Sequence, residues 1–113
     1  MKWLLNRNNV KIQLNTDKNI AGDERFEGYL SSLIGNELSR YSDQITRVEI
    51  HLADENAGKK GEDDKRCVLE ARIINRPPIA VTSHATTVNQ AVNDALAKLK
   101  ASIESVFDRL KNH

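Results

Sequence analysis

Apolar and polar side chains alternate along three stretches of the chain, residues 9–15, 46–54 and 66–74. A period of two is typical of a strand with one buried face, so each stretch predicts a strand. A fourth, shorter apolar run covers residues 79–83 and follows Pro77 and Pro78. Proline cannot donate a hydrogen bond to a β-ladder, so the two prolines indicate a turn before this fourth strand.

Two further stretches repeat apolar residues at helical spacing. The first predicts a helix from about Asp23, a plausible N-cap, to Tyr41. The second predicts a helix that begins near Val88, because Thr87 and Gln90 form a capping-box pattern just before it. Its apolar stripe continues through about six turns.

The predicted order of elements is therefore β-α-β-β-β-α. A strand-helix-strand step makes the first two strands parallel if they are neighbours, and short links make strands two to four an antiparallel meander. We expect residues 1–113 to form one domain of the α+β class, a two-layer sandwich. Its four-stranded sheet would carry both helices on one face.

Composition narrows the range of partners. The 17 basic and 16 acidic side chains give a net charge of +1, so no overall attraction to nucleic acid or membrane is expected. No apolar run is long enough for a signal peptide or a membrane span. Cys67 is the single cysteine and alternates inward with Leu69, which predicts a buried small hydrophobe in a reducing compartment. We expect a cytoplasmic protein without a membrane partner.

No constellation of side chains predicts catalysis. His51, His84 and His113 have no second ligand at metal-binding spacing, and the chain contains neither GxGxxG nor GxxxxGK. The carboxylates of residues 62–64 have no aliphatic neighbours in sequence that would raise a pKa for acid catalysis. We therefore expect a protein that is not an enzyme, with no catalytic residues, metal, cofactor or small-molecule substrate.

The outer side of the last predicted helix carries basic residues in two rows. Lys98 and Arg109 share one flank with two serines, and Lys100 and Lys111 share another. The simpler interpretation is an ordinary solvent-exposed helix face. An ion pair such as Lys100 and Glu104, four residues apart, contributes only ~0.2–0.5 kcal/mol to helix stability. Spacing alone favours this interpretation.

The N-terminal residues form a second basic region. Lys2, Arg7, Lys11 and Lys18 exceed the single nearby acid, Asp17. Trp3 lies among them, either as a packed side chain or as an exposed ring for stacking. We expect it to be packed.

Two longer segments carry a resemblance to a known family. They are "VEIHLADENAGKKGEDDKRCVLEARI" and "PPIAVTSHATTVNQAVNDALAKLK". Together with the order of elements, they resemble the ribosome hibernation-promoting factor family, also called ribosome-associated inhibitor A or ribosomal subunit interface proteins. The resemblance implies a fold similar to a double-stranded-RNA-binding domain. It also implies a non-catalytic factor that binds the small ribosomal subunit, its 16S rRNA and proteins, to inhibit translation and stabilise idle ribosomes.

The resemblance also assigns RNA contacts. Lys98 falls on the family's helix lysine, Arg109 and Lys111 fall on its basic C-terminal turns, and Lys100 lies beside them. Members of the family place further basic residues between these positions, where this chain has Ala101, Ser102, Ser105, Val106 and Phe107. Fewer phosphate contacts imply weaker binding at cellular salt.

The smaller number of basic residues on this helix leaves an alternative function open. The chain could be a protein-interaction or self-associating module that kept the fold and lost most of the RNA-binding surface. Val106 and Phe107 would form its patch if the sheet leaves them exposed, and a weak homo-oligomer would result. Because the chain ends at His113, without the second domain of the family's long forms, we expect it to act on single ribosomes or to assist another factor.

Overall fold

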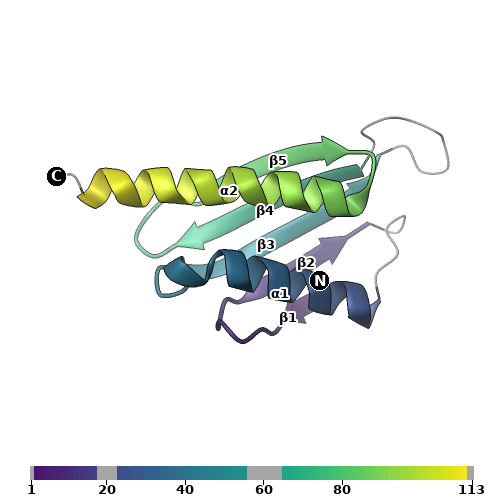
Figure 1. Ribbon diagram of the computed structural model, residues 1–113, viewed down its shortest axis with the longest axis horizontal. Helices are drawn as coiled ribbons and strands as arrows, with labels where there is room; N and C mark the ends of the chain where they lie inside the picture. The colour runs from purple at the N-terminus through teal and green to yellow at the C-terminus, as the bar shows by residue number, and fades with distance from the viewer. Residues whose placement is uncertain (1, 18–22, 56–64, 112–113) are drawn as a thin grey trace.

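Five strands, two α-helices and one short 3-10 helix make up the described part of the protein. The computed structural model describes residues 2–17, 23–55 and 65–111, with side chains up to residue 109 in the last range. The elements, in chain order, are β1 (Lys2–Leu4), β2 (Ile12–Thr16), α1 (Glu24–Glu37), the short 3-10 helix η1 (Ser39–Tyr41), β3 (Ile45–Asp54), β4 (Lys65–Ile73), β5 (Ile79–Ala85) and α2 (Val88–Lys111). Both helices lie on the same face of the sheet, α2 over β4 and β5 and α1 nearer the β1 edge (Figure 1).

The strands form one mixed sheet in the order β1-β2-β3-β4-β5. β2 pairs in parallel with β3, with Ile12 opposite Val48, while β3, β4 and β5 pair antiparallel. The predicted parallel step and meander are confirmed, as is the α+β class. The predicted four-stranded sheet is wrong, because β1 adds an antiparallel edge strand to β2, with Trp3 opposite Gln13. A three-residue strand is too short to show alternation in the sequence.

One face of the sheet and the inner sides of both helices form the core. Ile12, Ile50 and Leu69 point from the sheet into this layer, and each is fully buried. Ile34 of α1 and Leu99 of α2 meet them from above. Burying such side chains contributes about 1.5–3 kcal/mol each, which fixes both helices on this face.

Cys67 belongs to the same buried layer. Its side chain is fully buried, and this burial raises the pKa of the thiol to about 12. The thiolate is the reactive form of cysteine, so Cys67 is unreactive in the folded protein. The prediction of a small buried hydrophobe is confirmed.

Both predicted helix starts are confirmed. The Asp23 carboxylate accepts a hydrogen bond from the N–H of Phe26 at 2.8 Å, and the Thr87 hydroxyl accepts one from the N–H of Gln90 at 3.1 Å.

Near the C-terminal end of α2, the Phe107 ring stacks on Tyr41 of η1, with centroids 5.3 Å apart and planes 11° apart. Among the described helices, none has the length and apolar character needed to cross a membrane.

Candidate nucleic-acid interface

The flank of α2 that faces β5 carries Lys98. Its ammonium donates a hydrogen bond to the backbone carbonyl of Thr82 at 2.9 Å. β5 is an edge strand of the sheet, so Lys98 is fixed at the sheet's β5 edge. Lys98 is exposed and forms no ion pair with a carboxylate in the described part of the chain. Its positive charge is therefore held in a fixed place and is not neutralised.

Arg109 lies on the same flank, since eleven residues make about three helical turns. It is exposed and lines a shallow groove of about 430 Å³ between the end of α2 and the turn that joins β4 to β5. Arg76 lines the groove from the turn, and the floor is apolar, with Pro77 and Val106 among its side chains. Neither arginine has a hydrogen bond or ion pair from its side chain to any described residue. Together with Lys98, they define the basic flank of α2.

Lys100 lies on the opposite flank of α2, toward α1. Its ammonium is 3.1 Å from a carboxylate oxygen of Glu37, and each side chain of this pair is 43% exposed. The hydrogen bond and negative charge of Glu37 raise the pKa of Lys100. Lys111, predicted to share this flank, has its side chain outside the described residues. Among the four predicted contacts, therefore, only Lys98 and Arg109 are seen on one flank.

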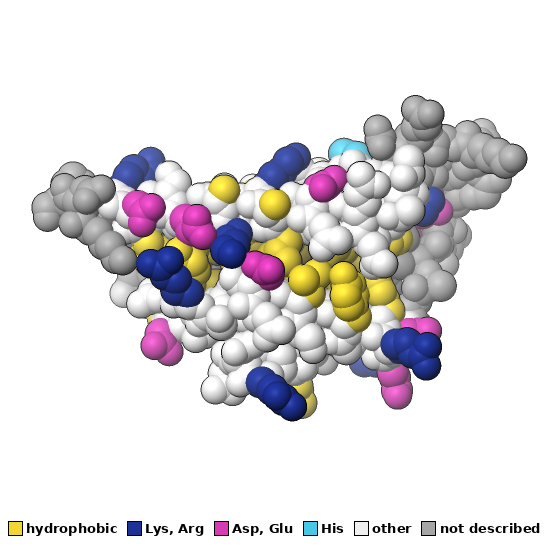
Figure 2. All heavy atoms as spheres, viewed as in Figure 1, with side chains coloured by type: hydrophobic (Ala, Val, Ile, Leu, Met, Phe, Trp, Pro, Cys, Tyr) yellow, Lys and Arg dark blue, Asp and Glu magenta, His cyan; other side chains and the backbone are white. Residues whose placement is uncertain are grey.

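Charges of both signs are interleaved over the helical face. Figure 2 shows basic and acidic side chains alternating along the upper part of this face, with no continuous basic band. Hydrophobic side chains lie in a line between the two helices in the same view. Individual unpaired cations, rather than an extended positive potential over the whole face, therefore determine where an anion would bind.

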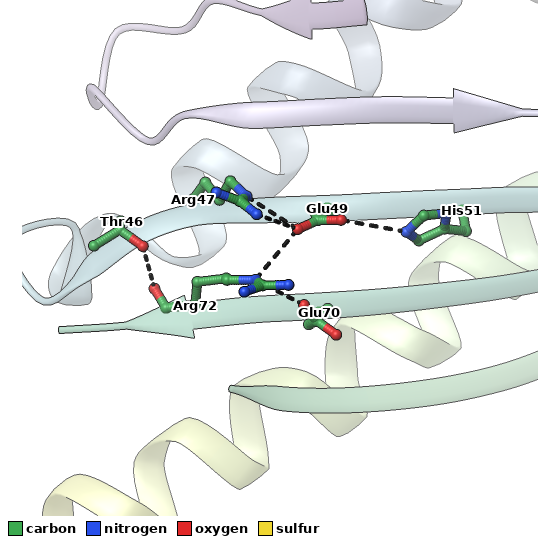
Figure 3. Close-up of polar contacts among 6 residues, drawn as sticks. All are labelled: Thr46, Arg47, Glu49, His51, Glu70 and Arg72. Atoms are coloured by element: carbon green, nitrogen blue, oxygen red, sulfur yellow. Dashed lines mark hydrogen bonds and ion pairs between the residues drawn. The ribbon is translucent and has the colours of Figure 1, made fainter. Parts of the chain in front are cut away.

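The helix-free face of the sheet carries a network of balanced charges (Figure 3). Glu49 of β3 accepts hydrogen bonds from Arg47, with Nε 3.0 Å and Nη2 2.9 Å from one carboxylate oxygen. Arg72 of β4 lies 3.3 Å from the same oxygen and 2.9 Å from Glu70. Two guanidinium groups thus face two carboxylates, so this part of the face has little net charge to offer a phosphate.

The network also affects the ionisation of Glu49. Its desolvation in the network works to raise the pKa, but the hydrogen bond from Arg47 and the charges of Arg47, Arg72 and His51 outweigh it. The net result is a lowered pKa. His51 Nε2 lies 3.6 Å from the other carboxylate oxygen. Glu49 therefore stays ionised at neutral pH and holds the two arginines in place.

Metal ligation has no support in the described ranges, which contain no group of three or more His, Cys, Asp or Glu side chains. His84 pairs with Glu55, at 2.8 Å, rather than with a further ligand. The loop carboxylates at 62–64 and His113 lie outside the described residues.

Three features of the molecular surface were missed or misjudged from the sequence. Arg76 was not expected to join Arg109, because their proximity depends on how α2 crosses the β4–β5 turn. Trp3 was expected to be packed, but it is 49% exposed. Phe107 does not form an exposed patch, because it packs on Tyr41. The sequence indicated only that Arg76 directly precedes Pro77 and Pro78 and would therefore lie at a turn.

A mixed five-stranded sheet covered on one face by two helices places the described residues in the class of small two-layer α+β domains. The family model described as "Sigma 54 modulation protein / S30EA ribosomal protein" matches residues 14–111. The chain belongs to this family, and the resemblance to ribosome hibernation-promoting factors is confirmed.

Solved structures show the same fold. The N-terminal domain of Protein Y from Thermus thermophilus is similar with a TM-score of 0.66 and 17% identity, covering 87% of this chain and 98% of that one. A ribosomal subunit interface protein from Coxiella burnetii is similar with a TM-score of 0.64 and 13% identity, covering 86% and 97%. A comparison with curated protein sequences finds no match.

Proposed function

We propose that this protein binds the small ribosomal subunit in the cytoplasm, through ribosomal RNA, and thereby inhibits translation and stabilises idle ribosomes. Membership of the S30EA family supports this function, as does the fold shared with a ribosomal subunit interface protein. The activity is occupancy of a site, with no chemical step. It requires only a folded domain that presents cations at the spacing of RNA phosphates.

The basic flank of α2 is the observation that carries the proposal. Lys98, Arg109 and Arg76 lie along the β5 side of the domain, and none forms an ion pair with a described carboxylate. Cations that are not neutralised within the protein neutralise phosphates and release condensed counterions, which drives binding. Contacts of this kind recognise the shape of a folded RNA rather than its sequence.

Lys100 is a further contact in this proposal despite its pair with Glu37. An ion pair between two exposed side chains contributes about 0–1 kcal/mol, so a phosphate can replace the carboxylate at small cost. Lys111 extends the same flank by sequence spacing. The proposed RNA contacts are thus Lys98, Lys100, Arg109 and Lys111, with Arg76 added.

Sedimentation with purified subunits tests this function. The protein is mixed with isolated small or large subunits, centrifuged through sucrose at low and at moderate salt, and detected in the pellets. We expect it to pellet with small subunits, and to lower the yield of an in vitro translation reaction in proportion to its occupancy. Absence from the small subunit at both salt concentrations would overturn the proposal.

The alternative is a protein-interaction module with the same fold. The interleaved charges and the line of hydrophobic side chains between the helices favour it (Figure 2). The patch suggested by the sequence does not, since Phe107 packs on Tyr41. Light scattering over a wide concentration range separates the two functions: a monomer that pellets with small subunits supports RNA binding, and a dimer that does not pellet supports the alternative.

A further inference from the structure

Strand β1 and the loop that follows it form a second surface, at the opposite edge of the sheet from β5. We infer that this surface binds an unpaired RNA nucleotide, whose base stacks on Trp3 while Lys11 and Arg7 neutralise the adjoining phosphates. The inference deepens the proposed function, because it rests on ribosomal RNA as the partner and names single-stranded RNA as the part bound at this edge. The family match begins at residue 14, so this surface lies outside the matched segment.

Trp3 and Lys11 line one open pocket of about 500 Å³. Trp3 lies opposite Gln13 in the β1–β2 pair, and Lys11 lies two residues before Gln13. Lys11 directly precedes β2 and is exposed, whereas Val10 and Ile12 on either side of it are buried in the core. Lys11 therefore continues the alternation of β2 and points with Gln13 and Trp3 to the helix-free side of the sheet. The indole ring and the ammonium group are therefore on the same side of the same pocket.

A second pocket, of about 580 Å³, adjoins the first. Leu5 and Asn6 line both pockets, and Arg7 lines the second one. The combined surface thus runs from the indole of Trp3, over Leu5, to the guanidinium of Arg7. Its volume lies in the range of small-ligand sites, about 300–1,000 Å³ for each pocket.

The loop between β1 and β2 is held firmly by one side chain. The amide oxygen of Asn6 accepts hydrogen bonds from the N–H groups of Asn8, at 3.0 Å, and Val10, at 3.3 Å, and its amide nitrogen donates to the Val10 carbonyl at 2.7 Å. Asn6 also lies against Gly35 of α1, where an added Cβ would come within 2.8 Å of it. The loop is therefore organised before any ligand arrives.

This organised loop nevertheless leaves two large apolar side chains in water. Leu5 is 93% exposed and Trp3 is 49% exposed. Exposed apolar surface beside a preformed loop marks an interaction site more often than a packing defect. A tryptophan ring next to a cationic groove is the arrangement on which single-stranded nucleic acids stack.

The charges around the loop select RNA over an apolar protein partner. Residues 1–16 contain no Asp or Glu but contain Lys2, Arg7 and Lys11. Lys2 pairs with Glu27 of α1 at 2.8 Å, whereas Arg7 and Lys11 have no ion pair within the described ranges. Lys11 lines the pocket of Trp3, and Arg7 lines the adjoining one, so the two cations can meet the phosphates next to a base that stacks on the indole.

Trp3 is the single tryptophan of the chain, so its fluorescence reports on this surface alone. The intact protein is titrated with a single-stranded hexamer of adenylate, with a hairpin duplex of equal charge as the comparison. We expect saturable quenching by the single strand and none by the duplex. The absence of quenching by the single strand at low salt would overturn the inference.

Variants assign the contacts, with affinity measured by anisotropy of an end-labelled hexamer. Trp3→Leu is expected to weaken binding about tenfold and Trp3→Phe much less, because stacking contributes through the aromatic ring. Tyr29→Leu, an exposed aromatic of α1 outside both pockets, is the matched control and should bind as wild type does. Lys11→Gln should make the salt dependence shallower by about 0.7. Equal affinity of Trp3→Leu and wild type would contradict the assignment.

Three outcomes separate this inference from the proposed function and from a protein partner. If wild type pellets with small subunits but the hexamer does not quench Trp3, this inference alone fails. If the hexamer quenches Trp3 but no protein pellets with subunits, the proposed function fails and RNA binding at this edge stands. Dimerisation that Trp3→Leu abolishes, with emission insensitive to RNA, would assign the surface to a second copy of the chain and overturn the inference.

Discussion

Lys100 of α2 and Glu37 of α1 form the ion pair that joins the two helices, with their charged atoms 3.1 Å apart. The two helices lie on the same face of the sheet (Figure 1), and the pair bridges the space between them. It places a cation of the proposed RNA contact surface beside a carboxylate of the same protein. In the proposed function, Glu37 therefore competes with an RNA phosphate for Lys100.

Replacing Glu37 should strengthen ribosome binding. In Glu37→Gln, Lys100 loses the carboxylate that a phosphate must otherwise displace, so we expect small-subunit affinity to rise by up to about fivefold. Sedimentation at several protein concentrations measures this change. Glu24→Gln removes one acid from the first turn of α1 and is the control, for which we expect no comparable gain. Equal effects of the two variants would attribute the gain to net charge alone.

The stack of Phe107 on Tyr41 should stabilise the end of α2. Phe107→Ala removes a half-buried ring and should lower the free energy of unfolding by about 2–3 kcal/mol. Phe107→Leu keeps apolar volume but loses the ring contact, and should cost about 1 kcal/mol. Urea denaturation measures both values. If the alanine variant were as stable as wild type but lost self-association seen in wild type, Phe107 would belong to an interface instead.

Two glycines of α1 should respond oppositely to alanine. At Gly35 a new Cβ would lie 2.8 Å from the side chain of Asn6, so Gly35→Ala should displace the β1–β2 loop and cost about 1–3 kcal/mol. At Gly28 a Cβ meets nothing within 4 Å, so Gly28→Ala should gain up to about 1 kcal/mol of helix stability. Thermal unfolding followed by far-UV circular dichroism compares them. A similar gain at both positions would show that the loop does not depend on Gly35.

The Glu49 network should make stability sensitive to acid. The pKa of Glu49 is lower in the folded protein than its ordinary value of 4.5. Its contribution to stability is therefore complete above pH 4.5 and is lost as the pH falls through the folded-state pKa. Wild type should lose more stability than Glu49→Gln in this acid range, as measured by urea denaturation at a series of pH values.

The control for this effect is another carboxylate. Glu104 of α2 has no hydrogen bond or ion pair with a described side chain, and Glu104→Gln should keep the acid sensitivity of wild type. If Glu49→Gln and wild type lost stability in parallel as the pH fell, the network would not contribute to the acid response.

Much of the fold follows from the sequence because the buried face repeats regularly. The alternation of Val48, Ile50 and Leu52 predicted β3, and Asp23 and Thr87 predicted the helix starts. β1 was missed because three residues give too few positions to show a period. Local patterns record which side of an element is buried, but not which extra segment lies at the sheet's edge.

The candidate site was harder to predict than the fold. Helical spacing correctly placed Lys98 and Arg109 on one flank. It could not show that Lys100 meets Glu37, 63 positions earlier in the chain, or that Arg76 borders the same groove as Arg109. Such contacts depend on where α1, α2 and the β4–β5 turn lie relative to one another on the folded sheet. The exposure of Trp3 likewise depends on β1 being an edge strand.

The salt dependence of small-subunit binding tests the central claim most directly. Each phosphate contact contributes about 0.9 to the slope of log affinity against log salt concentration. We predict that Lys98→Gln/Arg109→Gln has a slope shallower than wild type by about 1.8. The control variant is Arg25→Gln/Arg66→Gln, which also removes two cations, one in α1 and one in β4. This control should keep the wild-type slope. Equal slopes for wild type and the α2 variant would contradict the claim that this flank binds ribosomal RNA.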